Sequence, residues 1–377
     1  MTPPDRDLRT GRRVCLPAVM SSAILLATAG TAFGAQARPV HRPVRGEPTI
    51  TEFTVPTPHA HPFHIVTGSD GNPWFTERDA NKIGRITPDG VFSEFQVPTA
   101  NAKPAGIVLG PGDDVWFTES ASSKIGRINP DGVITEYTIC QGGAQPQRIT
   151  YGPDNAVWFT SLGTNRIGRI TPLGAYDEYP VPTPRSGVLN ITTGSDHNLW
   201  FAEMDANRIG RVTPTGVFSE FSLPTPADRP RGIASGPDGN LWITEYASNS
   251  VARMTLSGTT TQFPIPAANS TPVFITPGPD DAMWFSELTG NRIARIDPAN
   301  GVVAEFRVPT PGALPRGIVN GPDGNIWFAE ELGNKVGRLN LTPAAPRRAG
   351  PSHTTAESRE RGGAEQPTAD QPRRSRA

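Results

Sequence analysis

The sequence predicts an all-β protein, a closed seven-bladed β-propeller with four-stranded blades. The chain has seven tryptophans, and they recur every 42 residues, with 43 before the last: Trp74, Trp116, Trp158, Trp200, Trp242, Trp284 and Trp327. A Gly-Pro-Asp-Gly-like turn precedes most of them, and a Pro-Thr-Pro-like segment closes most units. Repeats of this length that contain only short strand and turn patterns are typical of propeller blades.

The N-terminal residues 1–37 have the pattern of a secretory signal peptide. Arg12 and Arg13 precede an apolar, small-residue run from Val19 to Ala35, and Ala35-Gln36-Ala37 is a cleavage-site pattern. The sequence therefore predicts a secreted or extracytoplasmic protein. The paired arginines leave two routes open, the twin-arginine route and the general one. Cleavage after Ala37 would leave Cys140 as the only cysteine, so no intramolecular disulfide is expected.

The segments that flank the repeats have no pattern of a packed fold. Residues 38–49 are a Pro-rich linker, and residues 342–377 have the composition of a disordered tail. The 35 basic and 36 acidic residues nearly balance, which argues against nucleic acid as a partner. No stretch of the chain is long and apolar enough for a membrane span.

The fifth unit shows how one repeat divides into four strands. Arg231–Ser235 is the first, and the turn Gly236-Pro237-Asp238-Gly239-Asn240 leads into a second strand, Leu241–Glu245. Asn249–Thr255 and Thr260–Pro264 are the third and fourth. Four antiparallel strands in each unit make a propeller blade.

The two ends of the repeat region, residues 50–341, predict how the ring closes. A fourth-strand pattern, Ile50–Phe53, comes before the first tryptophan unit, and the last unit stops after its third strand, Lys335–Leu341. The N-terminal strand is therefore expected to complete the last blade, which leaves no open edge.

Residues found in every unit serve the architecture, because a binding site needs only one or a few copies. The tryptophans belong to this class, as do the repeated arginines, which are expected to meet a repeated carboxylate or carbonyl, such as the fourth-strand glutamates: Arg85, Arg127, Arg169, Arg211, Arg253, Arg295 and Arg338. Glutamates at the end of the second strand form another near-complete ring, which is expected to make the channel mouth acidic: Glu77, Glu119, Glu203, Glu245, Glu287 and Glu330.

Functional residues are expected where the units differ, and one such place is the start of the first strand. His64, Arg148, Arg231 and Arg316 lie there and would face the second-strand glutamates, among them Glu330. These residues make either surface ion pairs or a polar pocket for a small ligand with oxygen acceptors. His59 and His61 accompany His64, so either a metal site or a solvated linker with one structural histidine fits this stretch.

The repeated phrases Trp-Phe-Thr-Glu, Asn-Lys-Ile-Gly-Arg-Ile-Thr-Pro-Asp-Gly and Glu-Phe-x-x-Pro-Thr-Pro resemble those of the streptogramin B lyase (virginiamycin B lyase) family. The resemblance covers residues 50–341. It implies a monomeric seven-bladed propeller and a Mg²⁺-dependent lyase that opens a cyclic depsipeptide antibiotic by β-elimination.

The residues that the family uses for this chemistry are mostly replaced here. The resemblance places a glutamate and a histidine at Leu314 and Arg316, a further histidine at Val273, and a metal-binding glutamate at Glu331. Only Glu331 is retained, so Mg²⁺ at Glu331 is implied by the resemblance alone. A guanidinium stays protonated near neutral pH and is no general base.

Three functions remain open on the sequence. The leading hypothesis is an exported lyase-like propeller that binds a small polar or peptide ligand at the channel mouth. The second is a Mg²⁺-dependent lyase that linearises type B streptogramin-like depsipeptides, a function in antibiotic resistance. The third is a protein-interaction propeller at the cell surface.

Overall fold

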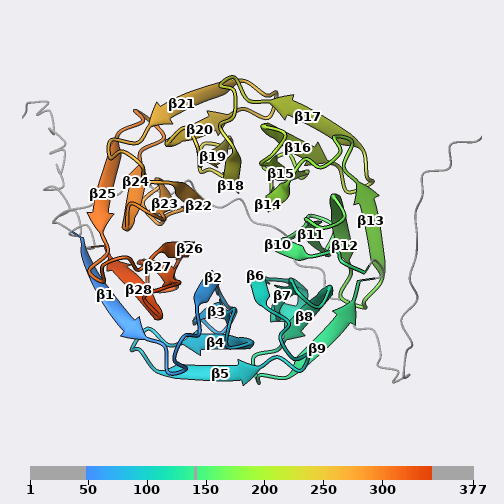
Figure 1. The fold of residues 1–377 in the computed structure, drawn as a ribbon, viewed down its shortest axis with the longest axis vertical. Helices are drawn as coiled ribbons and strands as arrows, with labels where there is room; N and C mark the ends of the chain where they lie inside the picture. Colours follow the sequence, from blue (N-terminus) through green and yellow to red (C-terminus); the bar gives the residue numbers. More distant parts are fainter. Residues whose placement is uncertain (1–47, 140–141, 342–377) are drawn as a thin grey trace, which may run out of the picture. The chain divides into compact units, whose positions relative to one another are not determined.

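The computed structural model describes residues 48–139 and 142–341, and these form a ring of seven four-stranded antiparallel sheets (Figure 1). The seven-bladed propeller predicted from the sequence is confirmed. The predicted signal peptide, nearly all of the linker, Cys140 and the predicted tail lie outside the described residues. Within these, no helix is long and apolar enough to cross a membrane.

Each blade runs outward from the centre of the ring in sequence order, except that the outermost strand of blade 7 is β1. The innermost strands of blades 1 to 7 are β2 Pro62–Thr67, β6 Pro104–Leu109, β10 Pro146–Tyr151, β14 Val188–Thr193, β18 Pro230–Ser235, β22 Pro272–Pro277 and β26 Pro315–Asn320. The second strands are β3 Pro73–Glu77, β7 Val115–Glu119, β11 Val157–Ser161, β15 Leu199–Glu203, β19 Leu241–Glu245, β23 Met283–Glu287 and β27 Ile326–Glu330.

The two outer strands of each blade are five residues long, except β28 and β1 of blade 7, which have six. The third strands are β4 Lys82–Ile86, β8 Lys124–Ile128, β12 Arg166–Ile170, β16 Arg208–Val212, β20 Ser250–Met254, β24 Arg292–Ile296 and β28 Lys335–Asn340. The fourth strands are β5 Phe92–Gln96, β9 Ile134–Thr138, β13 Tyr176–Pro180, β17 Phe218–Ser222, β21 Thr260–Pro264, β25 Val303–Arg307 and β1 Thr49–Thr54.

The ring closes through β1, as the sequence predicted. β1 pairs antiparallel with β28 in the last sheet, from Thr49 opposite Asn340 to Thr54 opposite Lys335. Glu52 on β1 accepts hydrogen bonds from the backbone N–H and the hydroxyl of Thr310, each 2.8 Å long. Strand β1 thus holds both β28, the last of the described strands, and the Pro-Thr-Pro segment that enters blade 7.

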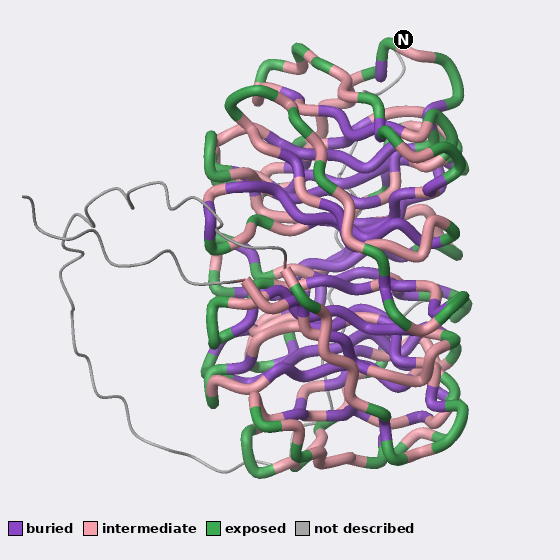
Figure 2. Tube along the Cα trace, turned by 90° about the vertical axis from the view of Figure 1, so that its left-hand side faces the viewer, coloured by how far each residue is buried: buried purple, intermediate pink, exposed green. Residues whose placement is uncertain are grey.

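Buried residues run along the strands of the ring (Figure 2), and their hydrophobic clusters join neighbouring blades, as where Trp74 of blade 1 packs with Phe117 of blade 2. All seven tryptophans are buried, and each stacks on the aromatic ring of a fourth strand; the Trp327 and Phe53 ring centroids, for example, are 5.6 Å apart. Aromatic stacking adds to the free energy that burial of these large side chains supplies. A side chain that recurs in every blade therefore holds neighbouring blades together.

The repeated arginines meet a repeated carboxylate, as predicted, but it is not that of the fourth-strand glutamates, the example that the sequence suggested. They pair with the aspartate of the turn between the first and second strands, as in the 2.6 Å contact of Arg295 Nε with Asp280 Oδ2. Asp280 also accepts a hydrogen bond from the Trp284 indole N–H at 2.9 Å. Blade 2 keeps the arginine pair, with Arg127 Nε 2.8 Å from Asp114 Oδ2, and its turn contains the short 3₁₀ helix η1 Pro111–Asp113. It has Gly112 where blade 1 has Asp70, so Trp116 Nε1 is buried without a partner.

The fourth-strand glutamates, which were expected to pair with those arginines, instead bind the basic residue at the start of the third strand in five blades, while Arg292 of blade 6 pairs with Glu287. Lys82 Nζ lies 2.9 Å from Glu94 Oε2, and Lys335 Nζ lies 2.7 Å from Glu52 Oε2. The cause is register: in blade 1 Lys82 and Glu94 share one face of neighbouring strands, whereas Arg85 reaches Asp70 in the opposite turn. The repeated arginine and the fourth-strand glutamate thus belong to separate polar clusters.

The second-strand glutamates do not make the channel mouth acidic. All six are fully buried, and burial raises the pKa of Glu77 and Glu330 to about 8. The nearby fourth-strand carboxylates, Glu94 and Glu52, raise these pKa values further. The prediction was wrong because these side chains turn into the blade rather than into the channel.

Candidate functional site

The variable residues of the repeats meet at the channel mouth, on the face where each first strand begins and each second strand ends. In every blade the pairing of the first two strands shifts register near the start of the first strand. Such a bulge re-aims side chains. It brings together Phe63 and His64 of blade 1, Arg148 of blade 3, Phe274 of blade 6 and Arg316 of blade 7.

Three guanidinium groups surround the ring of Phe63. Arg78, Arg148 and Arg316 lie with their Cζ atoms 4.8, 4.8 and 4.9 Å from its centroid. The negative face of an aromatic ring attracts cations and gives them a surface on which to pack. Phe63 is itself buried, so this cluster of arginines is built into the inner wall of the ring rather than spread over the outer surface.

Arg148 is the most enclosed of these arginines, with 4% of its surface exposed. Its guanidinium also lies 4.7 Å from the centroid of Phe274. Nε donates to Asn190 Oδ1 at 2.8 Å, and an Nη atom donates to the Gln147 carbonyl at 3.1 Å. Burial first, and then the charges of Arg231, Arg316 and Arg78, lower the pKa of Arg148, while Glu331 raises it.

Arg316 and Glu331 form the one ion pair of this cluster among residues 48–139 and 142–341. Nε of Arg316 donates to Oε2 of Glu331 at 2.5 Å, and both side chains are 14% exposed. Arg231 instead packs on Tyr246, with Cζ 5.1 Å from the ring centroid, and no carboxylate of the described residues contacts it. Burial and the charge of Arg316 lower the pKa of Arg231 to about 10.

His64 is held in its neutral form. Its Nδ1 accepts a hydrogen bond from the backbone N–H of Ile107 at 3.1 Å, and its ring lies 5.0 Å from that of Phe274. Burial, followed by the charge of Arg148, lowers the pKa of His64 to about 3. Gly317 of blade 7 lets the backbone approach His64 closely, because a Cβ at position 317 would come within 2.6 Å of the His64 Cα.

The other predicted residues of this region lie apart from the arginines. Glu330 is fully buried, and the groups that shift its pKa besides burial are Glu52 and Lys335, within its own blade. His61 pairs with Asp79 at 2.6 Å, while His64 bonds blade 2, so the two histidines have separate partners. Within residues 48–139 and 142–341 no group of three or more His, Cys, Asp or Glu side chains could hold a metal.

The residues around Glu331 do not fit Mg²⁺. A magnesium ion needs several oxygen ligands in near-octahedral geometry. Glu331 is engaged by Arg316, and the surrounding side chains, Arg78, Arg148 and Arg231, bring positive charge in place of oxygen ligands. The carboxylate that the family resemblance assigns to the metal is thus a partner of a guanidinium here.

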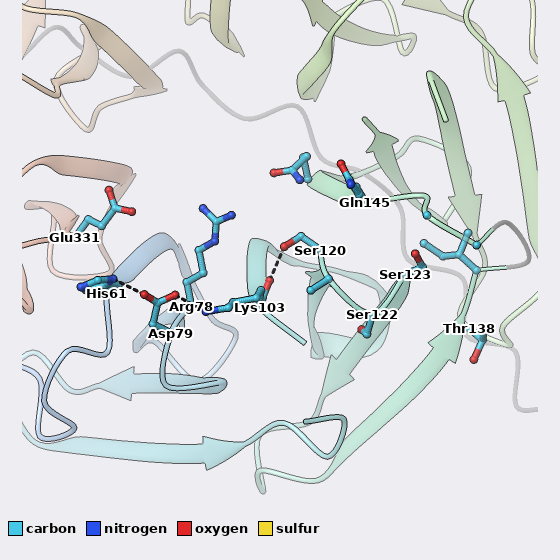
Figure 3. A pocket seen from close by; sticks show the side chains of 15 residues that line it. His61, Arg78, Asp79, Lys103, Ser120, Ser122, Ser123, Thr138, Gln145 and Glu331 are labelled. Carbon is cyan, nitrogen blue, oxygen red and sulfur yellow. Dashed lines mark hydrogen bonds and ion pairs between the residues drawn. The ribbon is translucent and has the colours of Figure 1, made fainter. Parts of the chain in front are cut away.

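A polar cavity of about 1120 Å³ adjoins the arginines (Figure 3). Arg78 and Glu331 point into its inner end, and the hydroxyl groups of Ser120, Ser122 and Ser123 line its wall. Lys103 reaches across to Asp79, at 2.8 Å, at its rim. A wall of hydroxyl groups and charges suits a polar ligand that makes many hydrogen bonds.

Sequence reasoning placed His64, Arg148, Arg231 and Arg316 at the channel mouth, and the structure brings the three arginines together there. It missed Arg78 and Tyr246, which follow the repeated second-strand glutamate. A usable signal was present, because the residue that follows the second strand differs in chemical type from blade to blade: Arg78, Ser120, Leu162, Met204, Tyr246, Leu288 and Glu331.

Comparison with known proteins gives one clear group of relatives. The profile of the Virginiamycin B lyase family matches residues 42–230 and 165–346. A streptogramin B lyase structure is 40% identical in sequence, with a TM-score of 0.75, over 78% of this chain and 98% of that chain. Virginiamycin B lyase from Staphylococcus aureus matches equally well, over 100% of its length. A catalytically inactive histidine-to-alanine variant of that enzyme, with quinupristin, has the same 40% identity and TM-score of 0.75.

More distant propellers share the fold alone. The WD40 propeller domain of Doa1 superposes with a TM-score of 0.64 at 13% identity. The repeated tryptophan of this chain is followed by Phe or Ile, so its blades differ from WD repeats in sequence.

Proposed function

The chain belongs to the virginiamycin B lyase family, and from that premise we propose that it binds a small polar or peptide ligand at its channel mouth without the lyase chemistry. The ion pair of Arg316 with Glu331, 2.5 Å long, carries this proposal. It occupies the place where the resemblance puts a histidine and a metal-binding glutamate. The polar cavity beside it gives a ligand room to bind.

The groups present at the mouth are poor bases for a carbon acid. β-Elimination needs a group that accepts a proton from carbon near neutral pH. A guanidinium such as that of Arg316 has only N–H donors and no acceptor, and the Glu331 carboxylate is bound to it. His64 is neutral, but its Nδ1 already accepts the Ile107 N–H, and a pKa of about 3 marks a weak base. Binding therefore fits these residues better than proton abstraction.

An active lyase is the second function, and sequence similarity favours it. The identity of 40% extends over 98% of the streptogramin B lyase chain. A lyase of this chain would need a base other than those the family resemblance assigns. Its proposed substrate class is a cyclic depsipeptide of the streptogramin B type.

One pair of measurements separates the two functions. The purified chain is mixed with quinupristin and excess Mg²⁺; mass spectrometry follows linearisation, and calorimetry with the same compound and with polar peptides follows binding. Binding with no linear product supports the proposal. Turnover on the order of 1 s⁻¹, ordinary for an enzyme, would establish the lyase instead. Absence of binding by any ligand that fits the cavity would overturn the proposed function.

We extend the proposal to location: the protein acts outside the cytoplasm after removal of residues 1–37. The basic, apolar and Ala-x-Ala pattern of that segment supports it.

A further inference from the structure

Four guanidinium groups converge at the channel mouth with a single carboxylate to balance them. The electrostatic neighbours of Arg148 are Arg231, Arg316, Arg78 and, with opposite sign, Glu331. Within residues 48–139 and 142–341, neither Arg78, Arg148 nor Arg231 has a carboxylate at ion-pair distance. Like charges held close together in a partly dehydrated site repel, and this cost is removed when an anion lies between them.

The most enclosed of the four gives an independent reason to expect a ligand. Only 4% of the Arg148 surface is exposed. Its hydrogen-bond acceptors are nevertheless two neutral oxygens, Asn190 Oδ1 and the Gln147 carbonyl. Buried charges in proteins are usually paired. The two aromatic rings beside it, Phe63 and Phe274, fix the plane of the guanidinium and bring no negative charge.

Packing alone does not account for the arrangement. An apolar side chain at position 148 would fill the space between Phe63 and Phe274 without the cost of burying a charge. Arg78 and Arg231 come from other blades and add charge to the same space. The planar fork of arginine matches the oxygens of carboxylate and phosphate groups, and clusters of arginine are typical of sites that recognise them.

We propose that the channel mouth is an anion site, at which Arg78, Arg148, Arg231 and Arg316 bind a small oxyanion ligand with at least two negative charges. The inference rests on the proposed function and names the ligand class of the same site. Glu331 neutralises Arg316 in the free protein and marks where one acidic group of the ligand binds. The site thus has the opposite charge preference to a magnesium site. The hydroxyl-rich cavity beside it holds the uncharged part of the ligand.

The test is calorimetric titration of the purified chain with citrate, inorganic phosphate, glycerol and MgCl₂. Citrate is expected to bind most tightly, phosphate more weakly, and glycerol not measurably. Binding of citrate is expected to weaken as NaCl is raised from 20 to 300 mM, because salt screens charges over a Debye length of about 8 Å at physiological strength. Citrate and phosphate also separate a polycarboxylate site from a site that prefers phosphate.

Variants locate the site. R78Q and R231Q should each weaken citrate binding by about 10- to 100-fold, the effect of a lost charge-assisted hydrogen bond. Both residues are partly exposed, so folding is expected to survive, and a thermal melt checks it. R307Q is the matched control, since it removes the same charge from an exposed residue of the outermost strand β25, away from the centre of the ring. It should leave the affinity unchanged.

The substitution E331Q separates the anion site from a metal site. Loss of the competing carboxylate should tighten citrate binding several-fold. Tighter Mg²⁺ binding by the parent chain than by E331Q, with no citrate binding by either, would overturn the inference. Binding of neutral peptides in the cavity with no response to anions would also overturn it but would leave the proposed function intact. Failure of all of these compounds to bind would overturn both the anion site and the proposed function.

Discussion

Lys335 and Glu52 are 283 positions apart in the sequence, and their side chains meet at 2.7 Å in the outer half of blade 7. The same Glu52 carboxylate holds Thr310 through two hydrogen bonds. A short strand from one end of the repeat region therefore binds two separate segments of the other end. The integrity of the ring depends on that strand.

Deletion of residues 48–54, which removes β1, should lower the melting temperature by many degrees or cause aggregation. The deletion exposes the edge of β28 and the ring of Trp327, on which Phe53 stacks at 5.6 Å. An unpaired edge strand is a template for association between chains. Thermal unfolding and light scattering measure the effect. E52Q, which keeps the strand, should cost far less; equal stability of the deletion and the parent would contradict ring closure.

The aspartate of the turn before the second strand should be essential to each blade that has it. D280A removes the acceptor for Trp284 Nε1 at 2.9 Å and for Arg295 Nε at 2.6 Å, and it leaves a buried N–H unpaired. Lost bonds of this kind cost about 2–4 kcal/mol in total. Chemical denaturation measures the change in free energy of unfolding. D89A, in an exposed turn, is the control and should be near neutral; a similar small effect of D280A would contradict the assigned role.

Stability should fall as the pH rises from 5.5 to 8.5. Burial raises the pKa of Glu77 and Glu330 to about 8 and that of Glu119, Glu203 and Glu287 to about 7. In the unfolded chain glutamates titrate near pH 4.3. The folded state therefore keeps protons that the unfolded state releases. The contribution of these glutamates to the free energy of unfolding is complete below the unfolded pKa and is lost as the pH rises through 7 to 8.

The fourth-strand glutamates act in the other direction at lower pH. Partial burial raises the pKa of Glu52, but hydrogen bonds from Lys335 and Thr310 lower it below its ordinary value. The stability that Glu52 contributes is therefore lost only as the pH falls through its pKa in the folded state. A melting temperature about 5 °C or more lower at pH 8.5 than at pH 5.5 is expected, which corresponds to a few kcal/mol. E77Q should reduce the slope. A melting temperature that rises over this interval would show that the buried carboxylates are ionised in the folded state.

Restoring the residues of the lyase resemblance should create a trace of lyase activity. R316H and L314E together would release Glu331 from its guanidinium and supply an imidazole and a carboxylate at the positions that the resemblance names. Linearised quinupristin, detected by mass spectrometry with excess Mg²⁺, is the readout. R316A with L314E is the control and should be inactive. Product from the control at the same rate would show that the imidazole has no part in the reaction.

Adding V273H to these two changes should carry a cost in stability. Val273 is fully buried within a hydrophobic cluster that includes Leu288 and Ala313. An imidazole there overpacks the core and buries polar nitrogens, which costs about 1–3 kcal/mol. A thermal melt of the triple variant against the double variant measures it. Unchanged stability would mean that position 273 has room for a histidine.

The fold could be predicted from the sequence because each blade repeats the same pattern of strands and turns. The spacing of the tryptophans determined the number of blades, and the unmatched strand before Trp74 predicted the closure that β1 makes. The fourth-strand glutamates were named wrongly as partners of the repeated arginines, because the side chains that share a face depend on the strand register. Arg85 lies opposite Ser93 and Gly84 opposite Glu94, so Arg85 and Glu94 lie on opposite faces of the sheet. Arg85 lies at the end of its blade that holds Asp70, away from Glu94.

The site was only partly predictable for a related reason. Comparison between repeats showed that Arg148, Arg231 and Arg316 vary, and it located them at the mouth. The contacts that define the site cross the channel, from Arg148 of blade 3 to Phe274 of blade 6 and Phe63 of blade 1. No local pattern encodes a contact between blades that are not neighbours. The ring geometry had to be known first.

Pairing of β1 with β28 also sets an order of events during synthesis. Thr49 is made 291 residues before Asn340, whose side chain binds it. At roughly 5–20 residues per second, about 15–60 s pass in which the first strand of the ring has emerged and its partner does not yet exist. Six blades can form in that interval, and the seventh waits for the last residues of the repeat region.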